Sequence, residues 1–355
     1  MNALQREALW RRLVEARIVG GSVPRATADA SPWYIRAMLG FAAWVAAMFL
    51  LIFVAMALHD LMRTDGAKII TGLGVCAGAV ALLRMPLGTF VGQLALAASI
   101  AGQTLFAIGM VGTFDRGVTP SALPMLAVAL LEAALAAAVP SIVHRVLTTV
   151  AAALALSLAF WSLGFGTLGL PLLVAAFAAV ALNDRAAARF PRAIPAIGVG
   201  LALAIAAALP VQIAGDEIFF WGRRVHDAVP APRFADAAMG LVLFGVALTL
   251  AVRAGIGRRS AGFALAIAGA LALAFAGFGV PGLAAALVIL LVGFATSSRF
   301  PMGLGVLALL GTLGRYYYAL SATLLTKSAI LLATGVVLLL VCAIFHGAGK
   351  EAPRA

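Results

Sequence analysis

The chain has few charged residues for its length. Only 11% of its 355 residues are Asp, Glu, Lys or Arg, whereas about a quarter of the residues in soluble domains are charged. Apolar residues make up 64% of the chain, and the mean hydropathy is +1.11. This composition excludes a soluble globular fold and predicts that nearly the whole chain forms one membrane domain.

Cysteine is also scarce. Cys76 and Cys342 both lie inside apolar runs, where a thiol usually acts as a small hydrophobic group. A disulfide between them would require the two runs to touch at the same depth. The first twenty residues are charged throughout and lack the apolar core of a signal peptide, so we expect no cleavage there.

The sequence lacks recognisable catalytic and metal-binding patterns. Its four histidines fall in four different predicted turns, without metal-ligand spacing or a Ser-His-Asp or Cys-His arrangement. They are His59, His144, His226 and His346. Two Gly-x-Gly-x-x-Gly segments, 164–169 and 277–282, each join two apolar runs, and neither follows a strand, so turns are expected rather than dinucleotide sites. The sequence therefore predicts no enzyme site, no metal and no cofactor.

Twelve apolar runs occupy most of the chain. They predict an all-α, polytopic transmembrane helical bundle of about 12 spans, with a range of 10–12. Several runs are shorter than the roughly 20 residues that a perpendicular span requires, so these are expected to tilt, to span in part or to extend into the turns. The runs are 33–58, 68–83, 89–111, 121–139, 146–163, 168–182, 193–209, 235–252, 260–276, 281–295, 302–313 and 327–345.

Three domains follow from these runs. Residues 1–32 are predicted to be a cytoplasmic N-terminal helix and linker, residues 33–345 the transmembrane helical domain, and residues 346–355 a cytoplasmic tail. Residues 2–18 are rich in helix formers and end before Gly20-Gly21, which indicates a helix. That helix either caps the membrane domain in water or docks on a membrane surface or a partner.

The basic residues predict the orientation. With twelve spans and a cytoplasmic N-terminus, 17 of the 25 Lys and Arg residues lie on the cytoplasmic side and 8 on the outer side. Lys and Arg are retained on the cytoplasmic side of membranes, so both termini are predicted to be cytoplasmic. The net charge of +12 then lies in membrane-facing loops, which favours the lipid bilayer and its anionic headgroups, and not nucleic acid, as the counterpart.

A candidate repeat spans four of the runs. Leu158-Ala-Phe160, the glycines of 164–169 and Arg189-Phe-Pro191 recur 110 to 115 residues later as Leu273-Ala-Phe275, 277–282 and Arg299-Phe-Pro301. Four spans per unit would make this a parallel repeat, related by an axis along the membrane normal. Either a duplication or the recurrence of Gly-rich and Arg-Pro turns for topological reasons explains the pattern.

Polar residues inside the runs are the candidate functional residues. Glu132 lies in the middle of its run, where a carboxylate costs about 2.5–3.5 kcal/mol, so its side chain should face protein or water. It is either a proton or cation site or a hydrogen-bonded structural residue. Gln93 and Gln103 are offset by about 80° on one helix, so both side chains can face the bundle interior, for interhelical hydrogen bonds or for ligand contact.

The last hairpin has the most distinctive sequence. An Arg299-Phe-Pro301 turn precedes the run 302–313, Tyr316-Tyr317-Tyr318 follow that run, and Lys327-Ser328 begin the final run. Tyrosines are expected at the membrane interface, and a lysine at a span end can extend its ammonium group to water. These residues either anchor the hairpin or bind a ligand, and Lys327 can pair with Glu132 only if the fold brings them together.

These residues resemble a family of bacterial integral membrane proteins known as domain of unknown function 4401. The resemblance extends over 31–345 and is carried by Ser31-Pro-Trp-Tyr-Ile-Arg36, Gly102-Gln-Thr-Leu105, Tyr316-Tyr-Tyr-Ala-Leu320, Leu324-Leu-Thr-Lys-Ser328 and Gly335. It implies a bacterial inner-membrane location and a companion membrane protein with a Gly-Asp-Tyr motif. It implies no activity.

Two functions therefore remain open from the sequence. The first is a membrane component that acts with a partner subunit, which the few intramembrane polar groups and the basic N-terminal helix favour. The alternative is a proton- or cation-coupled secondary transporter that uses Glu132, with Gln93, Gln103 and Lys327 as further members of an intramembrane polar site. An enzyme acting on lipid is a third possibility, but this sequence has no recognisable set of acid, base and nucleophile.

Overall fold

The computed structural model describes residues 3–21, 63–85, 88–114, 121–214, 232–255, 260–276 and 282–319, with Gly257, Leu325 and scattered positions between 34 and 56. All regular secondary structure in these residues is helical, which confirms the predicted all-α class. The helices are α1 (Ala3–Glu15), α3 (Asp65–Arg84), α4 (Thr89–Phe114), α5 (Ala122–Ala138), α6 (Ile142–Ser162), η2 (Gly166–Leu168), α7 (Gly169–Ala181), α8 (Asp184–Arg189), α9 (Ala193–Ala214), α10 (Pro232–Arg253), α11 (Ala261–Ala276), α12 (Leu283–Ala295) and α13 (Arg299–Ala319).

Five stretches of these helices are long and apolar enough to cross a membrane. They are Asp65–Arg84, Phe90–Phe114, Ile142–Ser162, Ala193–Pro210 and Phe234–Arg253. They indicate a membrane protein, because a run of this length and hydropathy satisfies its backbone hydrogen bonds within hydrocarbon only as a helix. Ten of the twelve predicted runs coincide with helices, while run 33–58 is described only at scattered helical positions and run 327–345 lies outside the described residues. The number of about twelve spans therefore stays a prediction.

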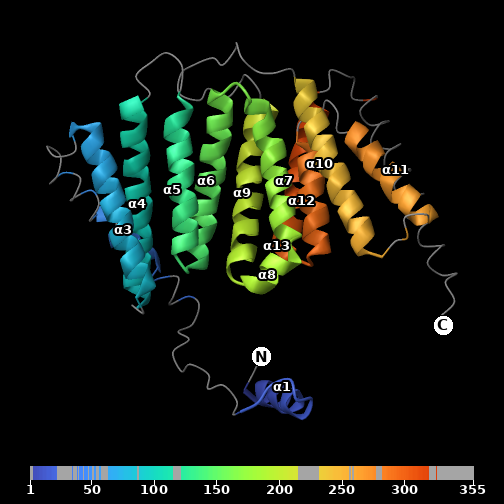
Figure 1. Ribbon diagram of the computed structural model, residues 1–355, viewed down its shortest axis with the longest axis horizontal. Coiled ribbons are helices and arrows are strands. Elements are labelled where there is room, and N and C mark those ends of the chain that lie inside the picture. The colour runs from blue at the N-terminus through green and yellow to red at the C-terminus, as the bar shows by residue number, and fades with distance from the viewer. Residues whose placement is uncertain are drawn as a thin grey trace.

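Helices α3 to α13 stand side by side in a curved row with similar axis directions (Figure 1). Neighbours in the sequence form antiparallel pairs, with α3 against α4, α5 against α6 and α12 against α13. The short α8 lies below the middle of the row in this view, at one set of helix ends, and we call this side of the row the α8 end. Helix α1 lies apart from the row, beyond the α8 end.

The apolar core lies where α7, α9, α10 and α12 meet. Phe177, Ile205, Leu243 and Ile289, one from each helix, are completely buried. Helix α6 packs against both α5 and α9. It therefore joins this apolar half of the row to the half formed by α3, α4 and α5.

The sequence 164–169 forms a turn, as predicted. Gly164 has φ +83°, a left-handed conformation that favours glycine, and η2 then leads directly into α7. In the second Gly-rich segment only Gly282 is described, and it precedes α12 with φ +87°. Because part of the second copy is outside the described residues, the four-span repeat is still a prediction.

Arg299-Phe300-Pro301 is not the predicted turn but the first turn of α13. Proline is tolerated there because the first N–H groups of a helix have no acceptor within that helix. The preceding residue Ser298 already accepts a backbone hydrogen bond from Met302. The helix therefore begins three residues before the predicted run.

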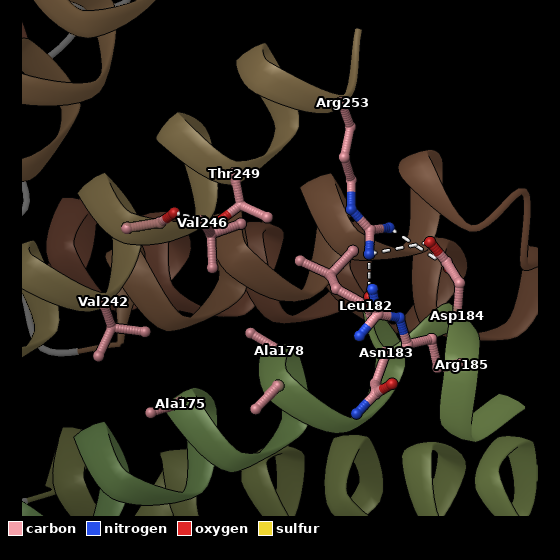
Figure 2. A pocket seen from close by; sticks show the side chains of 12 residues that line it. Ala175, Ala178, Leu182, Asn183, Asp184, Arg185, Val242, Val246, Thr249 and Arg253 are labelled. Atoms are coloured by element: carbon pink, nitrogen blue, oxygen red, sulfur yellow. Dashed lines mark hydrogen bonds and ion pairs between the residues drawn. The ribbon is translucent and has the colours of Figure 1, made fainter.

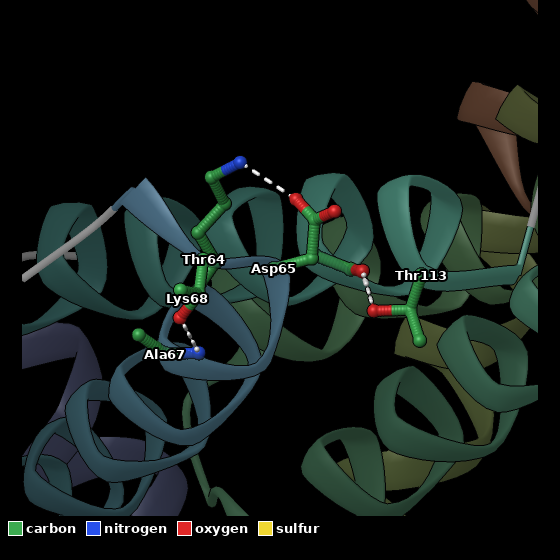
Figure 3. Close-up of polar contacts among 6 residues, drawn as sticks. Thr64, Asp65, Ala67, Lys68 and Thr113 are labelled. Carbon is green, nitrogen blue, oxygen red and sulfur yellow. Dashed lines mark hydrogen bonds and ion pairs between the residues drawn. The ribbon is translucent and has the colours of Figure 1, made fainter. Parts of the chain in front are cut away.

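Polar contacts tie the helix ends together on both sides of the row. At the α8 end, Arg253 of α10 donates to the Leu182 carbonyl after α7 and pairs with Asp184 of α8 at 3.0 Å (Figure 2). At the other end, Thr64 caps α3 by accepting from the Ala67 N–H at 3.2 Å, and Lys68 pairs with Asp65 at 2.7 Å (Figure 3).

Candidate functional site

Glycines bring α3 and α4 into backbone contact. A Cβ atom on Gly72 would lie 2.7 Å from the Gly102 carbonyl oxygen and from the Phe106 nitrogen. A Cβ atom on Gly102 would lie 2.8 Å from the Gly72 carbonyl oxygen and from Cys76 Sγ. Small residues permit this approach of membrane helices. The contact places Cys76 of α3 directly beside the polar face of α4.

Ser99 of α4 is the centre of a buried hydrogen-bonded chain. Its Oγ lies 2.8 Å from His144 Nε2 on α6, and Gln103 Nε2 donates to the same oxygen at 3.0 Å. Ser99 and His144 are 0% and 1% exposed. The Gln103 amide occupies only one lone pair of the hydroxyl, so this hydroxyl can either donate to Nε2 or accept from it. These hydrogen bonds therefore hold the imidazole through Nε2 alone.

Glu132 of α5 is buried as well. Its side chain is 2% exposed, and α5 packs against both α4 and α6. The Cys76 Sγ donates a weak hydrogen bond to the Ser99 carbonyl at 3.7 Å. Five buried polar side chains thus come from four neighbouring helices, and we call them the buried polar cluster: Cys76, Ser99, Gln103, Glu132 and His144.

Two atoms of the buried polar cluster lack hydrogen-bond partners. Glu132 Oε2 and His144 Nδ1 are both inaccessible to solvent, and neither finds a partner in the part of the chain that the structure describes. Most buried polar groups in proteins are hydrogen-bonded, because an unmade bond costs about 1–3 kcal/mol. These atoms can each receive or release a proton, or bind a small polar ligand.

Two arginines donate hydrogen bonds to the end of α5, at the α8 end of the row. Arg145 of α6, 9% exposed, donates to the carbonyls of Ala136 and Val139 at 2.8 and 2.9 Å. Arg84 of α3 donates twice to the Ala138 carbonyl, at 3.0 and 3.1 Å. The last carbonyls of a helix accept no hydrogen bond from within that helix and carry partial negative charge. Both cations therefore stabilise the end of α5. Arg84 remains exposed while doing so.

The other predicted site residues do not join the cluster. Gln93 Oε1 accepts a hydrogen bond from Trp44 Nε1 at 3.2 Å, which is an interhelical role and separates it from Gln103. Tyr317 lies half-buried near the end of α13, and the side chains of Tyr316 and Tyr318 are not described. Lys327 and Ser328 lie outside the described residues, so the predicted pairing of Lys327 with Glu132 is untested. Among the described residues no group of His, Cys, Asp and Glu could hold a metal.

The comparison with protein families identifies the chain. The family model described as domain of unknown function 4401 (DUF4401) matches residues 32–346. The chain belongs to this family. It matches no curated protein and no solved structure. The match confirms the resemblance drawn from the sequence and assigns this DUF4401 chain no activity.

The predicted position of His144 in this DUF4401 protein is wrong. The sequence predicts His144 in a turn before a run that starts at 146, but α6 begins at Ile142 and includes His144 in its first turn. Ser141 caps the helix by accepting from the His144 N–H at 3.5 Å. Pro140-Ser141 is an N-terminal signal that could have moved the helix start to 142. The role of Ser99 could have been suspected from its position four residues before Gln103, on the same helix face.

Proposed function

We propose that this DUF4401 protein is a proton- or cation-coupled membrane transporter in which Glu132 and His144 bind the coupling ion. The observation that carries the proposal is the pair of ionisable side chains, 2% and 1% exposed, that each keep one atom without a partner in the described residues. Ionisable groups within membrane helices are costly, and they commonly mark ion or proton pathways. A purely structural pair would be expected to use all its hydrogen-bonding atoms.

The surrounding residues suit a proton-binding pair. Ser99 and Gln103 hold His144 through Nε2, so Nδ1 keeps one orientation towards the interior. Ala129 and Ala133, next to Glu132 on α5, line a cavity of about 240 Å³ between α5, α6, α7 and α9. Its lining is apolar apart from Thr149 and Ser157 and does not include Glu132, so the cavity gives α5 room to move and not a polar path for water.

Proton flux into liposomes containing the purified protein tests the proposal. A potassium diffusion potential would drive protons inward, and a trapped pH-sensitive dye would report them. We expect flux above that of protein-free liposomes, and its loss in Glu132→Gln, which keeps the shape of the side chain but not its charge. Asp65→Asn is the matched control, because Asp65 pairs with Lys68 away from the cluster.

Two results would refute the proposal. Unchanged flux in Glu132→Gln removes Glu132 from the mechanism. No flux from the unaltered protein above that of empty liposomes, with either a proton or a sodium gradient, removes ion-coupled transport itself.

A membrane component that acts with a partner subunit is the second candidate. Helix α1 supports it, because this basic helix lies apart from the row of helices (Figure 1) and carries Arg11 and Arg12 on exposed positions. The sequence resemblance implies a companion with a Gly-Asp-Tyr motif in a bacterial inner membrane. Co-purification of that companion with the full chain, and its loss when residues 1–21 are deleted, would support this role. Reporter fusions should place both termini in the cytoplasm.

A further inference from the structure

A groove between α7 and α10 opens at the α8 end and has a volume of about 620 Å³ (Figure 2). Its walls divide into two parts. Along the helices the lining is apolar and mostly small, and at the α8 end it is polar and charged. The apolar wall comprises Ala175, Ala178, Ala179, Leu182, Val242, Gly245 and Val246, and the polar end Asn183, Asp184, Arg185, Thr249 and Arg253.

The charge at the polar end is not balanced. Arg253 is neutralised by Asp184, which it contacts at 3.0 and 3.4 Å. Arg185 is exposed and has no carboxylate partner in the described residues. One guanidinium group at the mouth of the groove is therefore available to an anion.

Asn183 adds an oriented donor to the same end. Its Oδ1 caps α8 by accepting from the Ala186 N–H at 2.9 Å. Because the cap occupies the oxygen, the Asn183 NH₂ group points the other way and remains available to donate. Arg185 and Asn183 thus present donors suited to phosphate oxygens, and a phosphate accepts charge-assisted bonds from arginine particularly well.

The apolar wall suits a hydrocarbon chain. Ala175 and Leu182 are seven residues apart on α7, which is about 10 Å along the axis. Small residues at Ala178, Ala179 and Gly245 make the groove, since larger side chains there would fill the space between α7 and α10. In a membrane protein this wall lies at hydrocarbon depth, while the charged mouth lies at the end of the helices, where headgroups are found.

We propose that this groove binds an anionic phospholipid, with one acyl chain along the α7–α10 wall and its phosphate at Arg185 and Asn183. The groove lies outside the buried polar cluster, so this site does not depend on the transport proposal. Basic pockets between membrane helices at the cytoplasmic side commonly bind anionic headgroups. The predicted orientation places the α8 end on that side.

Native mass spectrometry of the full chain, incubated with equal amounts of phosphatidylglycerol and phosphatidylcholine, tests the proposal. We expect retention of phosphatidylglycerol, reduced about fivefold in Arg185→Gln, since a basic residue near a headgroup contributes about that factor in affinity. Arg189→Gln is the matched control, because Arg189 is on the same helix but packs over Phe190 and does not line the groove. Gly245→Trp should fill the apolar wall and reduce retention of both lipids, because Gly245 lines the groove and a Cβ atom there would meet no atom within 4 Å.

Both variants at arginine change exposed side chains, so the fold should persist, and circular dichroism would confirm this. Equal retention of the two lipids by the unaltered protein would overturn the proposal. So would equal effects of Arg185→Gln and Arg189→Gln, which would indicate attraction by the surface as a whole. Unchanged retention in Gly245→Trp would remove the acyl chain from the groove.

Discussion

Two alanine substitutions in α3, two residues apart, should change stability in opposite directions. Gly72 faces α4, where an added Cβ atom would lie 2.7 Å from Gly102 O and Phe106 N and 3.0 Å from Phe106 Cα. All three are backbone atoms, so the helices would have to separate. Gly74 has no atom within 4 Å of the corresponding position.

The expected magnitudes follow from these contacts. Overpacking of this kind costs about 1–3 kcal/mol, so Gly72→Ala should destabilise the protein by that amount. Gly74→Ala should stabilise it by up to about 1 kcal/mol, because alanine is the better helix former. The two variants should therefore differ by roughly 1–4 kcal/mol, although each adds one methyl group to the same helix.

The thiol of Cys76 supplies the assay. It is 2% exposed and should react with a fluorogenic maleimide only when the α3–α4 contact opens. In a Cys342→Ser background, heating in detergent should give a reaction midpoint that is highest for Gly74→Ala and lowest for Gly72→Ala. A midpoint for Gly72→Ala equal to or above that of Gly74→Ala would refute the backbone contact between the two helices.

Two further predictions concern other contacts of the same helices. Arg145→Gln should lower the free energy of unfolding by about 3–5 kcal/mol, because two buried carbonyls lose a charged donor. Arg84→Gln, at an exposed position, should lower it by about 1 kcal/mol or less. The thiol assay measures both variants, and equal losses would contradict the cap at the end of α5. Gln93→Leu should remove the acceptor of Trp44 Nε1 and shift the emission of a variant that retains Trp44 as its sole tryptophan, whereas an unchanged spectrum would contradict this bond.

The helices themselves could be predicted closely. The run 121–139 became α5 (Ala122–Ala138), and the run 260–276 became α11 (Ala261–Ala276). In each case a serine stands directly before the helix, as Ser121 and Ser260. Apolar length and such start signals are local properties, so they can be read without knowing the fold.

The polar cluster could be predicted only in part. Glu132 and Gln103 stood out because each interrupts an apolar run, and both lie within the cluster. His144 and Arg145 did not, because residues near a helix end look the same whether they face water or a neighbouring helix. Their burial depends on α4 and α5 covering the start of α6.

Hydropathy alone determined that this chain forms membrane helices, because hydrocarbon offers the backbone no other hydrogen-bonding partner than itself. Only the tertiary structure decided which polar side chains meet. Ser99 and His144 are 45 residues apart in the chain, and α3 approaches α4 closely enough to include Cys76 because glycines face each other at Gly72 and Gly102. Such contacts depend on the shapes of two surfaces together, and neither helix carries that information by itself.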